Sequence, residues 1–234
     1  MKLIVTRYEY PCKEGRGLKI AQVSDLHNEE FKNDELLHRL CAEKPDLIAV
    51  TGDFFNRHRP YDEGPALSFF REAAKRFKVF CIEGNHEREI GERLRWREKF
   101  ATMGAIVLDN AFVDLTVGDC RLRIAGAMER AAVESIAAMQ TEERLTVTLS
   151  HRAERFEDYV AAGCRLTLCG HAHGGQMRPF GIGLYSPEQG VFPKYTKGVY
   201  RRGATTMIVS TGLGNTVGVP RLWNPRELVL ISLR

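Results

Sequence analysis

Short apolar segments alternate with helix-like segments along most of this chain, and polar residues follow directly where the apolar segments end. Buried strands are predicted over 18–23, 47–50 and 78–82. The residues just after them are Ser24-Asp25, Thr51-Gly52-Asp53 and Glu83-Gly84-Asn85-His86. Apolar residues at helical spacing predict two helices between these strands, one beginning at Asn33 and one over 65–77. This alternation is typical of βαβ units and a parallel sheet.

The middle of the chain breaks this alternation and then returns to it. Three strand candidates, 105–108, 111–117 and 120–125, are separated by turn-like pairs, which predicts hairpins. Further along we expect a strand over 145–149, a helix over 153–161, a strand over 166–169, a long loop over 174–203, and strands over 207–210 and 228–232. Because the composition shows no linker-like shift and no repeat, residues 1–234 are expected to form a single domain.

The composition is that of a soluble globular protein, with 44% hydrophobic and 27% charged residues in a chain of 234. No apolar run approaches the roughly 20 residues that are needed to cross a bilayer. The run Leu3-Ile4-Val5 is too short for the core of a signal peptide. The six cysteines contain no CxxC pair, which favours a reducing compartment over a disulfide framework. We therefore expect an intact cytoplasmic protein with no transmembrane segment.

Positive charge is concentrated near the carboxyl terminus. The net charge is +4, but residues 178–226 contain seven basic residues and one acidic residue, Glu188. This stretch also contains six aromatic residues: Phe180, Tyr185, Phe192, Tyr195, Tyr200 and Trp223. Two interpretations stay open, a solvated basic face and a surface that attracts an anionic ligand.

Five of the seven histidines follow predicted strands closely, together with two aspartates and one asparagine. These residues are His27, His86, His151, His171, His173, Asp25, Asp53 and Asn85. Any one of these short motifs alone is as readily a turn or a capped loop. Because ligands of open α/β sheets bind at the carboxyl ends of the strands, the eight side chains are expected to meet at one edge.

This set of side chains suits divalent metal ions. Imidazole nitrogens together with carboxylate and amide oxygens favour borderline metals, and the absence of cysteine from the set argues against a closed structural zinc site. The candidate ligands are Asp25, His27, Asp53, Asn85, His151, His171 and His173. Seven ligands exceed the needs of one ion and suit two ions that share a carboxylate. Two ions about 3.5–4 Å apart activate a bridging hydroxide and bind phosphate oxygens, so phosphoester hydrolysis is the indicated chemistry.

The order of these motifs resembles the calcineurin-like metallophosphoesterases. The matching blocks are Asp25-x-His27, Gly52-Asp53, Gly84-Asn85-His86-Glu87, His151 and Gly170-His171-x-His173. Further similarity in Gly174-Gly175-Gln176, Gly212-Leu213-Gly214-Asn215 and Pro220-Arg221 points to the bacterial YaeI/YkuE-type phosphodiesterase branch. The resemblance implies an α/β fold, a four-layer αββα sandwich of two mixed sheets flanked by helices.

The resemblance also implies a role for each residue. Asp25, His27 and His173 would hold one metal ion, and Asn85, His151 and His171 the other, with Asp53 bridging the two. His86 would bind no metal. It would contact the phosphate and protonate or stabilise the leaving oxygen, as a catalytic residue.

Asn56 departs from the family pattern, and two histidines lie outside the motifs. Relatives among the protein phosphatases have an aspartate that orients this histidine, three residues after the Gly-Asp aspartate, where this chain has Asn56. Either Asn56 donates a weaker hydrogen bond or another group orients His86, so Asn56 is left out of the catalytic set. His38 and His58 are expected at the surface, and His58 is also a candidate for the edge of the substrate site.

Residues 88–100 mix charges of both signs and predict a solvated helix. Leu94, Trp96 and Phe100 lie among these charges, which keeps open a lid or a membrane-surface role.

Together these observations predict a dinuclear metal-dependent phosphohydrolase with a metal-bridging hydroxide as nucleophile. The expected substrate is a small anionic phosphoester, a phosphodiester or pyrophosphate that is lipid-linked or nucleotide-linked. Mn²⁺ is the favoured cofactor, and Fe, Zn, Ni or Mg also suit the ligands. Two alternatives stay open, a non-catalytic metal-binding scaffold and a nuclease. Nucleic acid is disfavoured because the overall charge is modest, whereas peripheral contact with the inner membrane face is compatible with the sequence.

Overall fold

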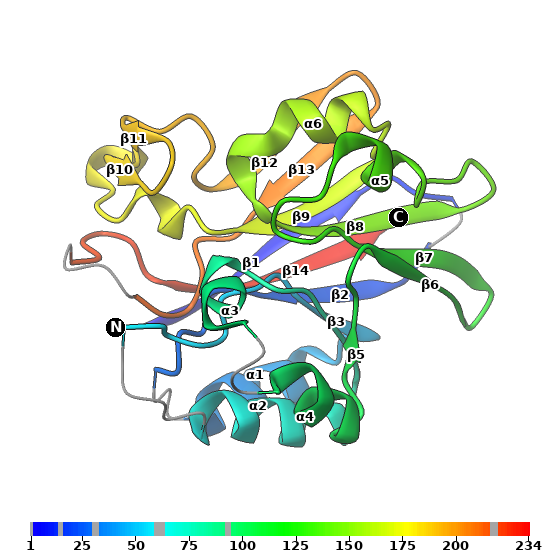
Figure 1. Ribbon diagram of the computed structural model, residues 1–234, viewed down its shortest axis with the longest axis horizontal. Coiled ribbons are helices and arrows are strands. Elements are labelled where there is room, and N and C mark those ends of the chain that lie inside the picture. The colour runs from blue at the N-terminus through cyan, green and yellow to red at the C-terminus, as the bar shows by residue number, and fades with distance from the viewer. Residues whose placement is uncertain (1, 14–15, 30–32, 59–63, 92–94, 216–219) are drawn as a thin grey trace.

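The chain forms two six-stranded sheets that pack face to face, with helices on both outer faces (Figure 1). The structure is a computed structural model that describes residues 2–13, 16–29, 33–58, 64–91, 95–215 and 220–234. The expected four-layer αββα sandwich of two mixed sheets is therefore confirmed.

The first sheet combines segments from both ends of the chain. Its strand order is β1 (Leu3–Tyr10), β14 (Arg226–Leu233), β2 (Lys19–Val23), β3 (Leu47–Val50), β4 (Lys78–Cys81) and β5 (Ile106–Val107). Strands β2 to β5 are parallel, whereas β14 runs antiparallel to β2 and parallel to β1. The helices that cover its outer face are α1 (Asn33–Glu43), α2 (Gly64–Ala74) and α4 (Trp96–Thr102).

The second sheet contains the predicted hairpin 111–125 at one edge. Its order is β12 (Gly198–Arg202), β13 (Thr205–Val209), β9 (Leu166–Gly170), β8 (Leu145–Arg152), β7 (Cys120–Gly126) and β6 (Ala111–Val117). The central strands are parallel, and both edge strands pair antiparallel. Its outer face is covered by α5 (Val133–Ala137) and α6 (Phe156–Ala161), and a separate hairpin consists of β10 (Tyr185–Ser186) and β11 (Gly190–Val191).

The strands are apolar throughout because both faces of each sheet are covered. In β3, Leu47 and Ala49 join the core between the two sheets, whereas Ile48 and Val50 join the core beneath the helices. Side chains from the two sheets, such as Phe80 and Leu122, meet in the central core. The two sheets are thus fixed against each other, and so are the loops at their strand ends.

The carboxyl ends of strands from both sheets meet at one edge. The Gln22 side chain in β2 donates a hydrogen bond to the carbonyl of Cys169 in β9, at 2.8 Å. The ring Nδ1 of His151 in β8 lies 2.7 Å from the carbonyl oxygen of Thr51, just after β3. Polar residues that follow strands of either sheet are therefore neighbours.

Several elements differ from the expectations from sequence. The hairpin expected between 105–108 and 111–117 is wrong, because β5 pairs with β4 in the first sheet and β6 with β7 in the second. The strands β1, β10, β11 and β12 were not predicted, and the last three lie inside the segment 174–203 that was expected to be a loop. The short helices α3 (Asn85–Ile90) and α5 were also not predicted. A lid or membrane role for Trp96 and Phe100 is wrong, because both side chains are fully buried in the core beneath the helices. Leu94 lies outside the described residues.

Within the described ranges, no helix combines the length and apolar character that crossing a membrane requires. The six cysteines, all of which are described, are free.

Candidate metal centre

All eight predicted site residues lie together at the edge where the strands of the two sheets end. Ligand atoms form three overlapping groups, each within 4.8 Å: Asp25 with His27 and His173, Asp53 with His151 and His171, and His27 with Asp53 and His86. These seven residues are each at most 4% exposed. Asn85 joins them through its Oδ1, 3.1 Å from His151 Nε2. The predicted convergence is confirmed.

The backbone around this site is strained. Five of the eight residues have left-handed backbone angles, with φ between +45° and +67°: Asp25, His27, Asp53, His171 and His173. Such angles are uncommon outside glycine and cost on the order of 1 kcal/mol each. Because the rest of the fold must offset this strain, its concentration here makes the cluster the candidate functional site.

The first group contains Asp25, His27 and His173. His27 Nδ1 lies 3.2 Å from the carbonyl oxygen of Phe55, so it carries the hydrogen and leaves the lone pair of Nε2 facing inward. His27 Nε2 is 3.2 Å from His173 Nε2, which is 3.6 Å from Asp25 Oδ1. Burial lowers the pKa of both histidines, so their neutral, ligand-competent forms are favoured.

The second group contains Asp53, His151 and His171. His151 Nδ1 bonds the Thr51 carbonyl and therefore carries a hydrogen, so Nε2 faces inward here as well. That nitrogen lies 3.2 Å from Asp53 Oδ2 and 3.2 Å from His171 Nδ1. Burial lowers the pKa of His151, but the Asp53 carboxylate more than offsets this and raises it to about 10. The pKa of His171 is lowered by burial.

Asp53 lies between the two groups. Its Oδ2 is 3.2 Å from His151 Nε2, 3.8 Å from His27 Nε2 and 3.9 Å from His86 Nε2. Burial raises the pKa of this carboxyl, but the surrounding histidines outweigh burial and hold it well below its usual range. Asp53 is therefore an anion of the second group that also lies beside His27 of the first.

The donor set fits divalent ions. Two atoms bound about 2.1 Å from one ion, at angles of about 90–110°, lie about 3.0–3.4 Å apart, which is close to the separations within each group. Buried lone pairs that face one another at these distances repel unless a proton or a cation lies between them, and the raised pKa of His151 beside Asp53 reflects this need for positive charge. His171 and His173 contact the other ligands through Nδ1 and Nε2, and their opposite ring nitrogens are buried without a hydrogen-bond partner in the described part of the chain. Two cations sharing Asp53 would satisfy this arrangement.

His86 is oriented by a backbone group and not by Asn56. The N–H of Arg57 donates a hydrogen bond to His86 Nδ1 at 3.1 Å, whereas Asn56 Oδ1 accepts from the N–H of His58. Because Nδ1 is an acceptor, the ring hydrogen is on Nε2, which faces the site. Burial lowers the pKa of His86 to about 4. A neutral His86 can donate a hydrogen bond from Nε2, and this favours stabilisation of a substrate oxygen over ligation of a metal.

Glu87 positions the site from beneath, and it was not among the residues predicted to act there. Its fully buried carboxylate accepts hydrogen bonds from the N–H groups of Asp53 and Gly84, both at 2.8 Å, and of Phe55 at 2.9 Å. The loops after β3 and β4 are thereby fixed together. The sequence signal is weak, because a capping box has Ser or Thr at the N-cap and this helix has Gly84 there.

A pocket of about 240 Å³ opens over the metal centre. Three arginines that the sequence did not single out line it, namely Arg57, Arg130 and Arg152, together with Glu89 and Glu188. His58 also lines this pocket, as expected for a residue at the edge of the site, whereas His38 is exposed on α1. The pocket therefore offers both metal ligands and cationic side chains to an anion.

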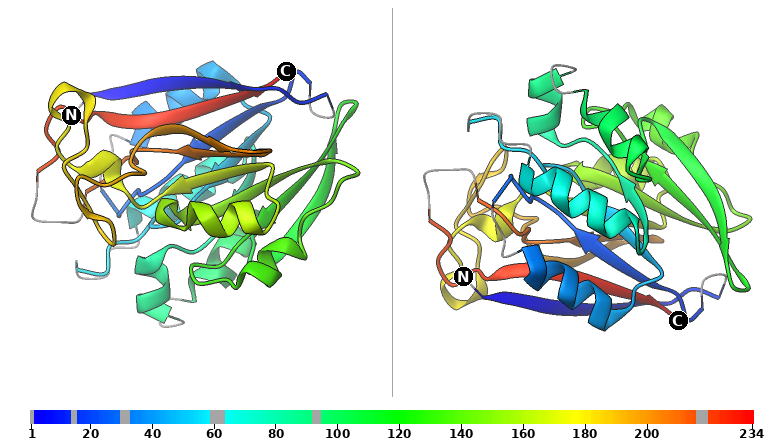
Figure 2. Two further views of the ribbon diagram at one scale, coloured as in Figure 1. Left: turned by 90° about the horizontal axis from the view of Figure 1, so that it is seen from above. Right: turned by 90° about the horizontal axis from the view of Figure 1, so that it is seen from below.

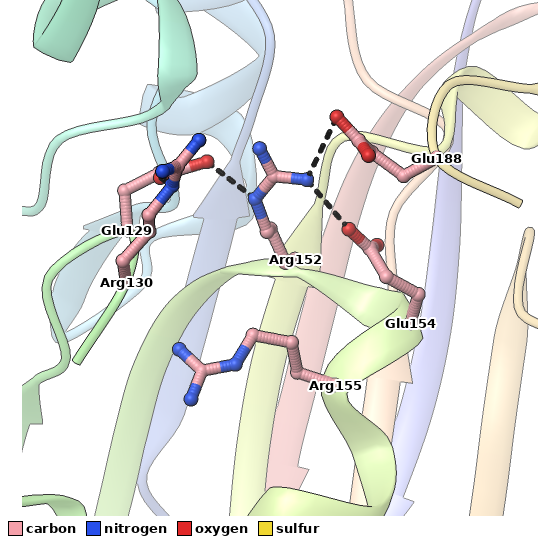
Figure 3. A pocket seen from close by; sticks show the side chains of 6 residues that line it. All are labelled: Glu129, Arg130, Arg152, Glu154, Arg155 and Glu188. Atoms are coloured by element: carbon pink, nitrogen blue, oxygen red, sulfur yellow. Dashed lines mark hydrogen bonds and ion pairs between the residues drawn. The ribbon is translucent and has the colours of Figure 1, made fainter. Parts of the chain in front are cut away.

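Arg152 links this pocket to a neighbouring hollow of about 420 Å³ (Figure 3). Its guanidinium bonds the buried Glu129 carboxylate and lies 2.9 Å from Glu154 and 3.2 Å from Glu188 (Figure 3). Glu188 is half exposed, so its attraction for Arg152 is weakened by solvent. The buried Glu129 therefore fixes the position of Arg152, whereas an anionic substrate could displace Glu188 from it.

Most basic residues of 178–226 have structural partners. Lys197, Arg202 and Arg226 pair with Glu227, Glu157 and Glu29. Two further cations of this segment, Arg178 and Arg221, donate hydrogen bonds to backbone carbonyls and hold loops in place. The segment is therefore neither a fully solvated basic face nor a surface devoted to an anionic ligand, because five of its seven cations stabilise the fold.

Comparison with known proteins agrees with this geometry. The family model of calcineurin-like phosphoesterases matches residues 18–175. The chain is 27% identical over 229 residues to the uncharacterized metallophosphoesterase YkuE of Bacillus subtilis, covering 93% of this chain and 79% of that protein. It is also 27% identical over 243 residues to phosphodiesterase YaeI of Escherichia coli, covering 99% and 88%.

A solved structure shows the same fold at low identity. The 5'-nucleotidase precursor from Thermus thermophilus superimposes with a TM-score of 0.56 at 14% identity. The match covers 83% of this chain but only 49% of that larger protein. The family resemblance expected from the motifs is confirmed: this chain belongs to the calcineurin-like phosphoesterases, a family of metal-dependent hydrolases that act on ester bonds.

Proposed function

We propose that residues 1–234 form one domain that acts as a dinuclear metal-dependent phosphodiesterase or pyrophosphatase. The observation that carries this proposal is the pair of buried ligand groups joined by the contact of Asp53 in one group with His27 in the other, at 3.8 Å. One ion would be held by Asp25, His27, His173 and Asp53, and the other by Asp53, Asn85, His151 and His171. Mn²⁺ is the preferred cofactor, and Fe, Zn, Ni or Mg suit the same donors. The phosphodiesterase name of the relative YaeI supports a diester substrate.

Two bound divalent ions would supply Lewis acidity, both to activate water and to offset the charge of phosphate oxygens. The chain supplies the rest of the chemistry. His86 Nε2–H would donate a hydrogen bond to a substrate oxygen as negative charge develops there, held in that orientation by the Arg57 N–H. Arg130 and Arg152 at the pocket edge would attract the anionic substrate.

The pocket supports a small phosphoester or a phosphate carried by a nucleotide or a lipid. Its edge includes Glu89 and Glu188 beside the arginines, and this mixture of signs disfavours a nucleic-acid backbone. We propose a cytoplasmic location, where six free cysteines stay reduced.

The test is hydrolysis of bis-p-nitrophenyl phosphate and p-nitrophenyl phosphate by chelator-stripped protein, with Mn²⁺ added back. We expect metal to restore cleavage of the diester, and His86→Ala to reduce kcat by about 10²-fold with metal content unchanged. His38→Ala, an exposed position on α1, is the matched control. Bound metal without cleavage of either ester would favour a binding scaffold, preference for the monoester would favour a phosphatase, and salt-sensitive cleavage of single-stranded DNA or RNA would favour a nuclease.

Glu188 is expected to compete with the substrate for Arg152. In Glu188→Gln, KM for a nucleotide-linked diester should fall by about two- to fivefold with kcat unchanged, because the charge opposite Arg152 is removed. Glu157→Gln removes an equally exposed partner of Arg202 and should leave KM unchanged. A higher KM in Glu188→Gln would mean that Glu188 binds the substrate itself.

A further inference from the structure

Exposed apolar side chains gather in one part of the molecule. In the described residues, six large apolar side chains between 42% and 102% exposed come from two segments near the carboxyl terminus. We call them the apolar tip: Phe180, Ile182, Val191, Phe192, Leu222 and Trp223. Soluble proteins seldom expose such clusters unless the surface has a partner.

Backbone contacts bring the two segments together. Met177 bridges Leu222, and the Arg178 N–H donates to the Leu222 carbonyl at 2.9 Å. The Phe192 N–H donates to the Leu184 carbonyl at 2.9 Å, which places the strand β11 beside the residues that follow Phe180. Figures 1 and 2 show the yellow β10–β11 hairpin and the red-orange segment before β14 at the same end of the molecule.

Three aromatic residues of the apolar tip have left-handed backbone angles. The φ values of Phe180, Phe192 and Trp223 are +53°, +54° and +53°, and the three side chains are between 72% and 102% exposed. For bulky residues this conformation is an outlier that costs free energy. The fold therefore bears strain at residues whose side chains gain nothing from burial within the chain.

We propose that the apolar tip docks on an anionic lipid bilayer. Aromatic side chains are favoured at the boundary between lipid headgroups and acyl chains. Lys194 is exposed two residues after Phe192, and Glu188 in the turn of the same hairpin pairs with Arg152, so Lys194 supplies positive charge beside the apolar tip. Positive charge beside exposed aromatics matches an anionic membrane surface.

Docking would bring the catalytic pocket to the membrane. Tyr185 lines that pocket and pairs with Val191 of the apolar tip across the β10–β11 hairpin. A phosphoester in a lipid headgroup would thereby reach the metal centre without leaving the bilayer. This assignment of the substrate class rests on the proposed function, whereas docking itself does not.

Tryptophan fluorescence provides a direct test, because the chain has two tryptophans in opposite environments. Trp96 is fully buried and Trp223 is 73% exposed, so a change on adding lipid reports on Trp223. With metal-free protein and vesicles of equal phosphatidylglycerol and phosphatidylcholine, we expect a blue shift and co-sedimentation, both weaker with phosphatidylcholine alone. Phe180→Ser with Phe192→Ser should weaken vesicle affinity by about tenfold or more.

Phe112→Ser is the matched control, since Phe112 is an exposed aromatic residue on β6, in the edge hairpin of the second sheet. It should bind vesicles like the unchanged protein, and both variants should cleave a soluble diester at the unchanged rate. Absence of a blue shift, or equal loss of binding in both variants, would overturn docking. Concentration-dependent dimerisation that buries Trp223 without lipid would assign the surface to a second copy of the chain. Vesicle binding without faster cleavage of lipid-borne than of soluble phosphoesters would overturn only the substrate class.

Discussion

Asp53→Asn should reduce phosphoester hydrolysis by about 10³-fold or more, a loss of several kcal/mol of transition-state stabilisation. Asp53 Oδ2 faces nitrogens of both ligand groups, at 3.2 Å from His151 and 3.8 Å from His27. An amide retains the shape of the side chain but removes the negative charge that would hold two cations close together. Metal content should therefore fall below two ions per chain, as measured by elemental analysis after dialysis against Mn²⁺.

Asp114→Asn is the control for this substitution. Asp114 pairs with Arg123 on the edge hairpin of the second sheet, so the same chemical change there should leave metal content and turnover intact. If Asp53→Asn loses metal but keeps full activity, the bridging role of Asp53 is wrong. If it keeps both ions and loses activity, Asp53 acts on the substrate or on water and not on the metals.

Gly84→Ala should lower the free energy of unfolding by about 3 kcal/mol and abolish activity. Gly84 has an ordinary φ of −104°, so the alanine backbone is not itself strained. The added Cβ would lie 2.2 Å from Asp53 Oδ1 and 2.5 Å from the Asp53 backbone nitrogen. Neither atom can retreat easily, because the N–H of Asp53 is bonded to Glu87 and Oδ1 to the N–H of His86.

Gly163→Ala separates this contact from the general effect of replacing glycine. Gly163 has a φ of +71°, but a Cβ there would meet nothing within 4 Å, so the expected loss is about 1 kcal/mol from the backbone alone. Urea denaturation of both variants gives the comparison. Equal losses, or a stable and active Gly84→Ala protein, would show that the loops after β3 and β4 move apart more freely than their contacts indicate.

The central parallel strands were predictable because they are buried on both faces. Segments such as 47–50 and 166–169 had to be continuously apolar, and they form β3 and β9 close to the expected bounds. The edge strands β1 and β12 escaped prediction for the opposite reason. Each has a neighbour on one side only and contains exposed charged residues, such as Arg7 and Arg202, so neither has an apolar run longer than Leu3-Ile4-Val5.

The solvated helix expected over 88–100 shows why a local charge pattern does not determine whether a helix is buried. α4 contains Arg97 and Lys99, but Trp96 and Phe100 from the same helix pack in the core. These two aromatics are at positions i and i+4 and share one face of the helix, so that face is buried whatever the charge of the opposite face. A mixed sequence of this length is compatible with a solvated helix, a lid or a core helix, and only the packing of α4 against α2 and β5 distinguishes them.

The residue types at the metal centre were determined by the sequence, because strand ends of an α/β sheet converge and imidazole with carboxylate suits divalent ions. Three features were decided by the tertiary structure. The Arg57 N–H that orients His86 is a backbone group, and no side-chain pattern can reveal it. The arginines at the pocket edge come from two loops and the end of β8, and their convergence depends on how the two sheets pack. The cations of 178–226 pair with Glu29, Glu157 and Glu227, partners brought to them only by long-range contacts. The metal-binding chemistry was therefore predictable from local sequence motifs. The orientation of His86 and the ion pairs of 178–226 depend on contacts that form only in the folded chain.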